Sequence, residues 1–174
     1  ILLSALFATS ALATGRSRVL VLDLDTVGTT LTEAEALNLT KLVRKSALDV
    51  MGDGHDVLPR EAVLETSERV RKSCTPGTCE AEIGRALGAQ LIVSGSLRER
   101  FGLLNLQLRL TATDDPKLLG IKIDWVRGGE ALPDAMGKLT RDLLDPASDR
   151  GEAGQPGTMT SPVLGVQKRT SIAA

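Results

Sequence analysis

The sequence predicts an α/β domain with α+β character, built on a mixed sheet that combines one crossover-linked part with an antiparallel hairpin. A short apolar run precedes a long amphipathic segment within residues 18–51. A second amphipathic run leads through a glycine into another apolar run within 79–97, and residues 104–125 alternate between apolar and polar side chains around a turn. We expect the helices mainly on one face of this sheet, and the polar face of the hairpin in contact with water or a partner.

The expected helices have clear start and stop signals. Residues 32–51 form the longest, because Thr32 can cap the N-terminus and Gly52 ends the apolar periodicity. Gly84 costs up to about 1 kcal/mol relative to alanine inside a helix, which close packing of that helix on the sheet would explain. Further helices are expected over 60–71, 79–87 and 134–144, and strands over 18–23 and 56–59.

The hairpin supplies the candidate contact surface. Residues 104–110 alternate leucine with polar side chains, and 119–125 repeat the pattern after a turn at 114–117. A free sheet edge is a second candidate, because an exposed edge can accept a partner strand. The predicted partner surface consists of Asn105, Gln107, Arg109, Thr111 and Lys122.

Composition argues against several classes of partner. The net charge is −1, which gives no general electrostatic attraction to nucleic acid or to an anionic membrane. The only aromatic residues are Phe7, Phe101 and Trp125, so the chain has few platforms on which bases could stack. We therefore expect a protein partner and no nucleic acid.

The two ends of the chain differ in character from its middle. Residues 1–13 are apolar and small and end in Ala-Leu-Ala, which is typical of a signal peptide, here expected to be truncated at its start. The alternative is a buried hydrophobic N-terminal helix. We expect a mature N-terminal segment at 14–17, the folded domain at 18–145, and a linker or disordered tail at 146–174, where Gly, Pro, Ser and Thr predominate. No membrane span is expected in the mature chain.

The two cysteines flank a predicted turn. Between Cys74 and Cys79 lies Thr-Pro-Gly-Thr, whose Pro and Gly suit the central positions of a type II turn. Such a turn favours a structural disulfide, which an oxidising compartment would allow. Two alternatives stay open: a redox role, because Cys79 lies near a helix N-terminus, and free thiols.

One motif suggests an enzyme. Asp23-Leu-Asp25-Thr26-Val27 resembles the D-x-D-x-[TV] motif of haloacid dehalogenase-type phosphotransferases, in which the first aspartate is the nucleophile and the second the acid/base around Mg²⁺. The topology argues against this alternative, because that fold needs helices between successive parallel strands.

One histidine, His55, and two cysteines are too few for a Cys/His zinc site. We therefore assign no catalytic, cofactor-binding or metal-binding residue, and we expect no enzyme.

The order of elements resembles the exported α/β domain of CsgG-like proteins and of the TolB N-terminal domain. Similar domains occur in penicillin-binding-protein activators and in secreted proteins of myxobacteria. The segments that carry the resemblance are 19–23, the long helix through Leu42 and Val43, 56–60, 79–96 and 104–110. It implies a non-enzymatic role in secretion or cell-envelope assembly, in the periplasm or outside a Gram-negative cell, with an envelope protein as partner. Membrane-spanning hairpins are not implied, because residues 98–102 are only a short connection between strands. A lipid anchor is not expected either, because no cysteine follows the expected cleavage site.

Overall fold

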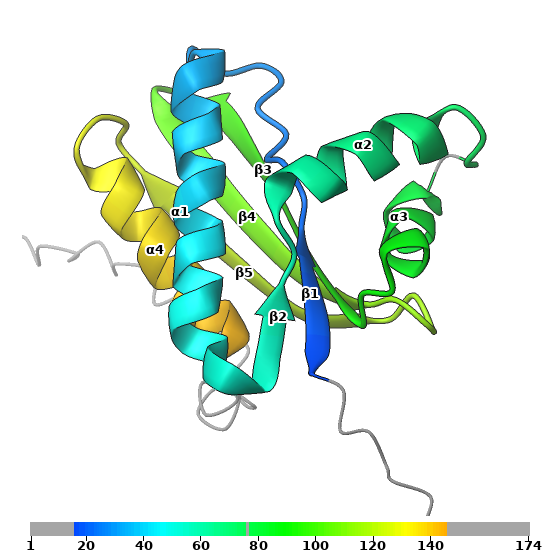
Figure 1. Cartoon of the computed structure of the whole chain (residues 1–174). Helices are drawn as coiled ribbons and strands as arrows, with labels where there is room; N and C mark the ends of the chain where they lie inside the picture. The colour runs from blue at the N-terminus through cyan, green and yellow to red at the C-terminus, as the bar shows by residue number, and fades with distance from the viewer. Residues whose placement is uncertain (1–15, 76, 146–174) are drawn as a thin grey trace, which may run out of the picture.

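The computed structural model describes residues 16–75 and 77–145 as a five-stranded mixed sheet with four α-helices (Figure 1). The expected signal peptide at 1–13 and the expected tail at 146–174 lie outside the described residues. In chain order the elements are β1 (Ser17–Val21), α1 (Glu33–Met51), a 3₁₀ turn (Gly52–Gly54), β2 (His55–Val57), α2 (Arg60–Arg71), α3 (Cys79–Leu87), β3 (Leu91–Arg100), β4 (Leu103–Ala112), β5 (Leu118–Val126) and α4 (Ala131–Leu144).

The sheet has the order β2-β1-β3-β4-β5. β1 lies between β2 and β3 and is parallel to both, with Val19 opposite Val57 on one side and Leu91 on the other. β3, β4 and β5 are antiparallel and follow one another through two hairpins. The predicted α/β class, with its crossover-linked part and its antiparallel part, is confirmed.

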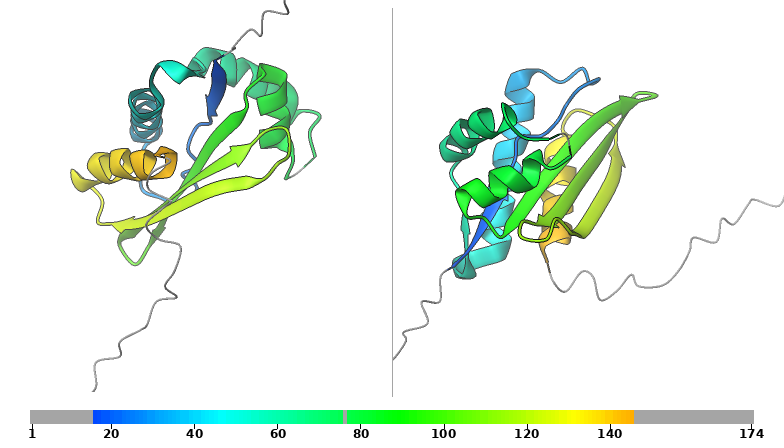
Figure 2. Two further views of the ribbon diagram at one scale, coloured as in Figure 1. Left: turned by 90° about the horizontal axis from the view of Figure 1, so that it is seen from below. Right: turned by 90° about the vertical axis from the view of Figure 1, so that its right-hand side faces the viewer.

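The four helices divide between the two faces of the sheet (Figures 1 and 2). The two longest, α1 and α4, pack side by side over a core that includes Val43, Leu106 and Met136. The shorter α2 and α3 cover the other face of β1 and β3, around Ile83 and Ile92. The two longer helices thus lie on one face, as expected, and the two shorter helices cover part of the other face.

The ends of α1 follow the predicted signals. Thr32 and Glu35 form a reciprocal capping box, in which the Thr32 hydroxyl accepts from the Glu35 amide and the Glu35 carboxylate accepts from the Thr32 amide. The carboxylate accepts from the Thr32 amide and also from the Thr32 hydroxyl, and these two hydrogen bonds lower the pKa of Glu35. Gly52 ends the helix with a φ of 56°, a conformation that glycine tolerates best.

Arg44 is the main exception to the amphipathic pattern of α1, because a charged residue of such a helix is expected on its solvent side. Only 8% of it is exposed, and its guanidinium donates to the Val21 carbonyl at the end of β1. Burial lowers the pKa of Arg44, since desolvation disfavours the charged form. The side chain thus ties the middle of α1 to the strand beneath it.

Close packing accounts for Gly84 in α3, as the sequence predicts. A Cβ at this position would lie 2.9 Å from Ile92 Cδ1 and 2.9 Å from two side-chain atoms of Thr113. The absence of a side chain therefore lets α3 approach β3 and the end of β4. Gly88 then ends the helix in the left-handed conformation, with a φ of 63°.

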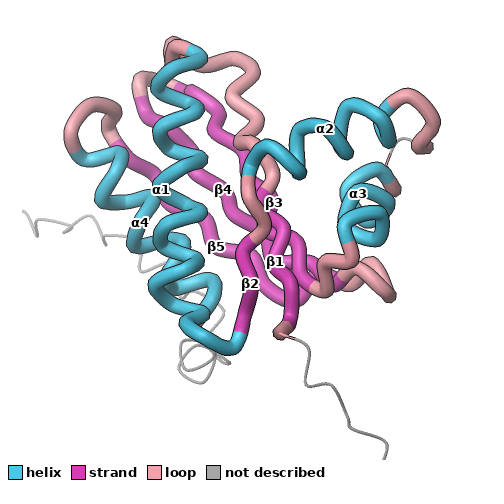
Figure 3. The backbone as a smooth tube through the Cα atoms, in the orientation of Figure 1, coloured by secondary structure: helices cyan, strands magenta, loops and turns pink. Residues whose placement is uncertain are grey.

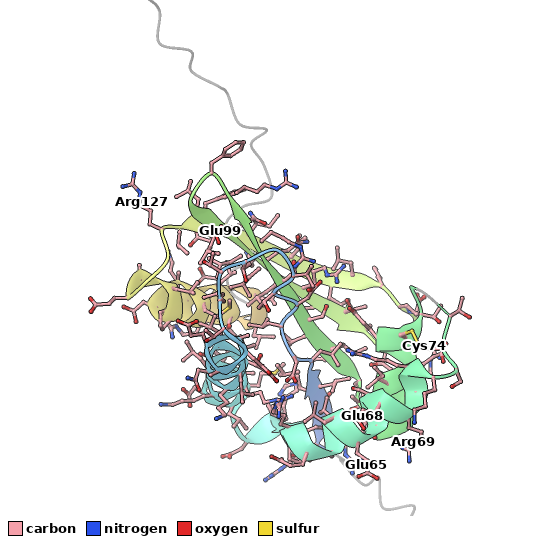
Figure 4. The ribbon with its side chains drawn as sticks, turned by 90° about the horizontal axis from the view of Figure 1, so that it is seen from above. Glu65, Glu68, Arg69, Cys74, Glu99 and Arg127 are labelled. Atoms are coloured by element: carbon pink, nitrogen blue, oxygen red, sulfur yellow. A yellow bond between two sulfur atoms is a disulfide. The ribbon has the colours of Figure 1, made fainter. Side chains whose placement is uncertain are left out.

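The β3–β4 hairpin turns on Phe101 and Gly102, with φ values of 54° and 72°. Two successive positive φ angles are typical of the two-residue turns that match the twist of a hairpin. The Phe101 ring is fully exposed. Figure 4 shows this end of the molecule with Glu99, whose carboxylate accepts from the amide and hydroxyl of Thr30 and so fastens the loop before α1.

The side chains of β5 have the opposite orientation to the one expected from the sequence. Lys122 lies opposite Leu108, which belongs to the core under α1 and α4, whereas Ile123 lies opposite Gln107. The apolar residues of the alternation therefore face outward, and Ile121, Ile123 and Trp125 are 41%, 55% and 51% exposed. The inward-facing position of Gly120 lies close to Leu143 of α4, whose Cδ1 is 3.3 Å from the site of an added Cβ.

Candidate functional site

A groove of about 750 Å³ lies where the carboxyl end of β1 meets β3. α1 leaves β1 on one face, and α2 and α3 lie on the other, so this is the point at which the crossovers change sides (Figure 3). Crevices of this kind are the usual ligand sites of open α/β sheets. The polar residues lining it are Asp23, Asp25, Arg71, Glu80, Ser94, Ser96, Arg98, Gln107 and Arg109.

Asp23 is held by an arginine from the start of α2. Arg60 Nε donates to Asp23 Oδ1 at 3.1 Å, and its Nη2 donates to Oδ2 at 2.7 Å. This two-point contact is the strong form of an arginine–carboxylate pair, and the carboxylate raises the pKa of Arg60. Asp23 therefore joins the end of β1 to α2.

Asp25 is held in the same manner by Arg98 of β3. Arg98 Nη2 donates to Asp25 Oδ2 at 2.5 Å, and its Nη1 donates to the Asp25 carbonyl at 3.1 Å. Asp25 also bridges to β3 through its backbone, with its amide 3.0 Å from the Gly95 carbonyl. The hydrogen bond from Arg98, followed by one from the Val27 amide, lowers the pKa of Asp25.

This ion pair predicts a dependence of stability on pH. The pKa of Asp25 in the folded protein lies below its ordinary value of 3.8. The contribution of the ionised carboxylate is therefore present above that value and is lost as the pH falls through the lower, folded pKa. Between about pH 7 and about pH 3, the wild-type free energy of unfolding should fall more than that of Asp25→Asn, measured by urea titration.

A matched substitution separates this ion pair from the general effect of acid. Asp49→Asn removes an exposed carboxylate from α1 and should leave the wild-type acid dependence unchanged. Equal acid dependence in wild type and in Asp25→Asn would contradict the assignment.

The third carboxylate of the groove is also matched with an arginine. Nη2 of Arg109, on β4, lies 3.4 Å from Oε1 of Glu80, on α3. Asp23, Asp25 and Glu80 thus each face a guanidinium, whereas a magnesium site needs carboxylate oxygens free to bind the ion. Among residues 16–75 and 77–145, no group of three or more His, Cys, Asp or Glu side chains could hold a metal ion.

Ser94 lies on the floor of the groove and is 4% exposed. Its hydroxyl has no hydrogen-bond partner among the described residues. A buried hydroxyl in this position is free to donate to, or accept from, a polar group that enters the groove. Ser94 could not be selected from the sequence, because one serine in a strand carries no distinguishing signal.

The predicted disulfide between Cys74 and Cys79 is present. The two Cα atoms are 5.2 Å apart, and the Thr78 amide donates to the Thr75 carbonyl at 3.0 Å across the turn. Gly77 has a φ of 94°, the positive angle expected at the third position of the predicted turn. Cys74, labelled in Figure 4, lies between the end of α2 and the start of α3. The disulfide therefore fixes the start of α3 beside the groove.

Four of the five predicted partner-surface residues share one face. Asn105, Gln107 and Arg109 lie opposite Arg98, Ser96 and Ser94 of β3. Thr111 follows on the same face, opposite Ile92. Lys122 does not join them, because its position opposite Leu108 places it on the side of α4.

The apolar half of this surface was not predicted from the sequence. Ile121, Ile123 and Trp125 lie opposite Arg109, Gln107 and Asn105. We define the open face as these six residues together with Thr111; in the part of the chain that the structure describes, no helix covers it over β5 (Figure 2). Alternation reveals two faces but does not say which one is buried, so only the register with β4 identifies the open face.

Among the described residues, no helix is both long and apolar enough to cross a membrane.

Comparison with known proteins shows a likeness in structure. No family model and no curated protein matches the sequence. The LpoB C-terminal domain from Escherichia coli is 14% identical with a TM-score of 0.52, and the match covers 66% of this chain and 85% of that domain. The corresponding domain from Salmonella enterica is 18% identical with a TM-score of 0.49, and the match covers 68% of this chain and 87% of that one. The PelC dodecamer from Paraburkholderia phytofirmans is 17% identical with a TM-score of 0.44, and the match covers 79% of this chain and 91% of that one.

At these low sequence identities, the likeness extends to the fold and not to the partners of the matched proteins. The shared fold is seen in the match to the E. coli domain, which covers most of that domain. The chain therefore has the α/β fold of the LpoB C-terminal domain, and the expected resemblance to exported domains of the CsgG-like and TolB N-terminal type is confirmed at the level of the fold.

Proposed function

We propose that this domain is a non-enzymatic binding module of the bacterial envelope, and that a partner protein contacts its open face. The observation that carries the proposal is the outward orientation of Ile121, Ile123 and Trp125 on β5. Three neighbouring large apolar side chains, each about half exposed, form a patch that folding leaves in water. Contiguous exposed apolar patches mark sites of protein–protein contact.

The β4 side of the open face suits such a contact. Each outward apolar residue lies directly across from a polar one: Trp125 from Asn105, and Ile123 from Gln107. Apolar anchors beside groups that form hydrogen bonds are the usual make-up of a protein interface, and tryptophan and arginine contribute most often to its energy. A partner with an apolar patch beside acidic and amide groups would complement this face.

Two features support a location in the envelope. The signal peptide predicted at residues 1–13 would direct the chain to an oxidising compartment, in which the Cys74–Cys79 disulfide is stable. The fold shared with the E. coli LpoB domain agrees with the exported class that the sequence resembles. We infer a periplasmic or secreted location in a Gram-negative bacterium.

A charge inserted into the open face tests the contact. Asn105→Arg places a long cationic side chain beside Trp125, whereas Asn38→Arg makes the same change on an exposed position of α1, on the opposite side of the sheet. Capture from an envelope extract, followed by quantitative mass spectrometry, should enrich a protein with wild type and with Asn38→Arg. The same protein should be lost with Asn105→Arg, and equal retention by both variants would contradict the proposed surface.

The alternative phosphatase function finds no support in the site. Asp23, the nucleophile of that hypothesis, is bound at two points by Arg60. The sheet has two antiparallel hairpins where that fold requires helices between parallel strands. Magnesium-dependent phosphatase turnover that is lost in Asp23→Asn would overturn the non-enzymatic proposal.

A further inference from the structure

We propose that the domain pairs with a second copy of itself through the edge of β5, as antiparallel strands related by a two-fold axis at Ile123. Pairing would use the backbone edge of β5, whereas the proposed partner contact uses the side chains of the open face. Both involve Ile121, Ile123 and Trp125, and substitutions that change one without the other separate them.

β5 is the edge that invites pairing. The sheet ends in β2 on one side and β5 on the other. β2 spans only three residues and is soon followed by Pro59, which cannot donate a ladder hydrogen bond. β5 spans nine residues without proline and carries isoleucine and tryptophan. A long edge strand without proline is a template for another strand, provided that its two inward charges, Lys122 and Asp124, meet opposite charges.

Two-fold symmetry restricts the possible registers. In antiparallel pairing, directly opposite residues lie on the same face of the sheet, and a two-fold axis places one residue opposite its own copy. Near the middle of β5, the residue on the axis is Lys122, Ile123 or Asp124. Each choice fixes which charges meet on the side of α4.

Charge selects one of these registers. An axis at Lys122 brings two lysines opposite each other, and an axis at Asp124 does the same with two aspartates. An axis at Ile123 places Lys122 opposite Asp124 of the second copy, and this pair occurs twice by symmetry. Opposite charges across a strand pair stabilise it, and like charges directly opposite destabilise it. The Ile123 register is therefore the favoured one.

The same register joins the exposed apolar side chains. Ile123 meets Ile123 of the second copy, and Ile121 meets Trp125 of the second copy, again twice. Aromatic and β-branched residues form the most stabilising cross-strand pairs. This pairing gives a reason for the 55% exposure of Ile123 in the single chain. It also joins the two open faces into one symmetric surface.

Two complementary variants test the register. Lys122→Asp gives each chain two aspartates at these positions, and Asp124→Lys gives each chain two lysines, so both charge pairs become repulsive in either homodimer. We expect each variant alone to associate at least about tenfold more weakly than wild type in sedimentation velocity. An equimolar mixture should recover the wild-type dimer, because both opposite-charge pairs return only in the heterodimer.

Cysteine cross-linking gives a second test that leaves the charges in place. Ile123→Cys puts the introduced thiol beside its own copy at the axis, so mild oxidation should yield a species of twice the mass. Ile121→Cys is the matched control on the same strand and face. Its thiol lies opposite Trp125 of the second copy, and its cross-linking should be much weaker.

Three results would overturn the proposal. They are a wild-type chain that stays monomeric as its concentration is raised, a mixture of the charge variants that associates no better than its components, and equal cross-linking of the two cysteine variants. A monomer whose β5 edge is covered by another protein, or by residues 146–174, would give the first of these results. Loss of the envelope partner in Asn105→Arg with an intact dimer would support the proposed function alone.

Discussion

Gly95→Val is expected to lower the free energy of unfolding by about 3 kcal/mol, the upper end of the usual cost of overpacking a core. A Cβ at Gly95 would lie 2.5 Å from Leu108 Cδ2, 2.7 Å from Leu24 Cδ2 and 3.0 Å from the Gln107 carbonyl oxygen. Both leucines are buried, so neither can turn out into solvent, and the carbonyl belongs to the strand ladder. The space at Gly95 lets the chain after β1 lie directly against β3. Urea unfolding at neutral pH measures the loss.

Two controls make this prediction specific. Gly54→Ala adds a methyl group where no atom lies within 4 Å, and it should change stability little. Gly95→Val should cost less in a Leu108→Ala background, because the two substitutions share one space and are not additive. A Gly95→Val protein as stable as wild type would show that β3 and β4 can separate without cost.

Removing the disulfide is the second substitution with a large expected effect. Cys74→Ser combined with Cys79→Ser should destabilise the protein by about 2 kcal/mol, because the crosslink closes a short loop and limits the unfolded chain only modestly. The loss should appear as a lower urea midpoint with an unchanged transition slope. The start of α3 should also become more open to amide hydrogen exchange, since the crosslink fixes it to the end of α2.

Reductant provides the control for the crosslink. Wild type in reductant should approach the stability of the double serine variant, and the variant itself should not respond. A variant as stable as oxidised wild type would mean that the turn holds its shape through the Thr75–Thr78 hydrogen bond alone.

Much of the fold could be predicted from local chemistry. α2 and α3 have the expected bounds, 60–71 and 79–87, because their apolar spacing and the glycine after α3 are local signals. Thr32 and Gly52 bound α1 for the same reason, and the Cys74–Cys79 turn needs only six consecutive residues. The bounds of the strands depend on pairing, and β3 runs to Arg100 because its last residues pair with the start of β4.

The candidate site depended much more on contacts between distant residues. Asp25 and Arg98 are far apart in sequence, so nothing local indicates that they form an ion pair. Arg44 has an ordinary position in an amphipathic helix, and its burial follows only from the approach of α1 to β1. One wall of the groove is the start of α3, and this helix lies close to β3 because Gly84 has no side chain.

Local sequence is sufficient to predict the helices, their caps, the disulfide turn and the alternation of the hairpin, because each depends on residues within a few positions of one another. The face of β5 that meets water is known only from the pairing of β5 with β4. An alternating strand has two possible orientations, and the pairing of Lys122 with Leu108 selects the one that exposes Ile121, Ile123 and Trp125. Register is a property of two strands together, so no pattern within β5 could have revealed the surface on which the proposed functions depend.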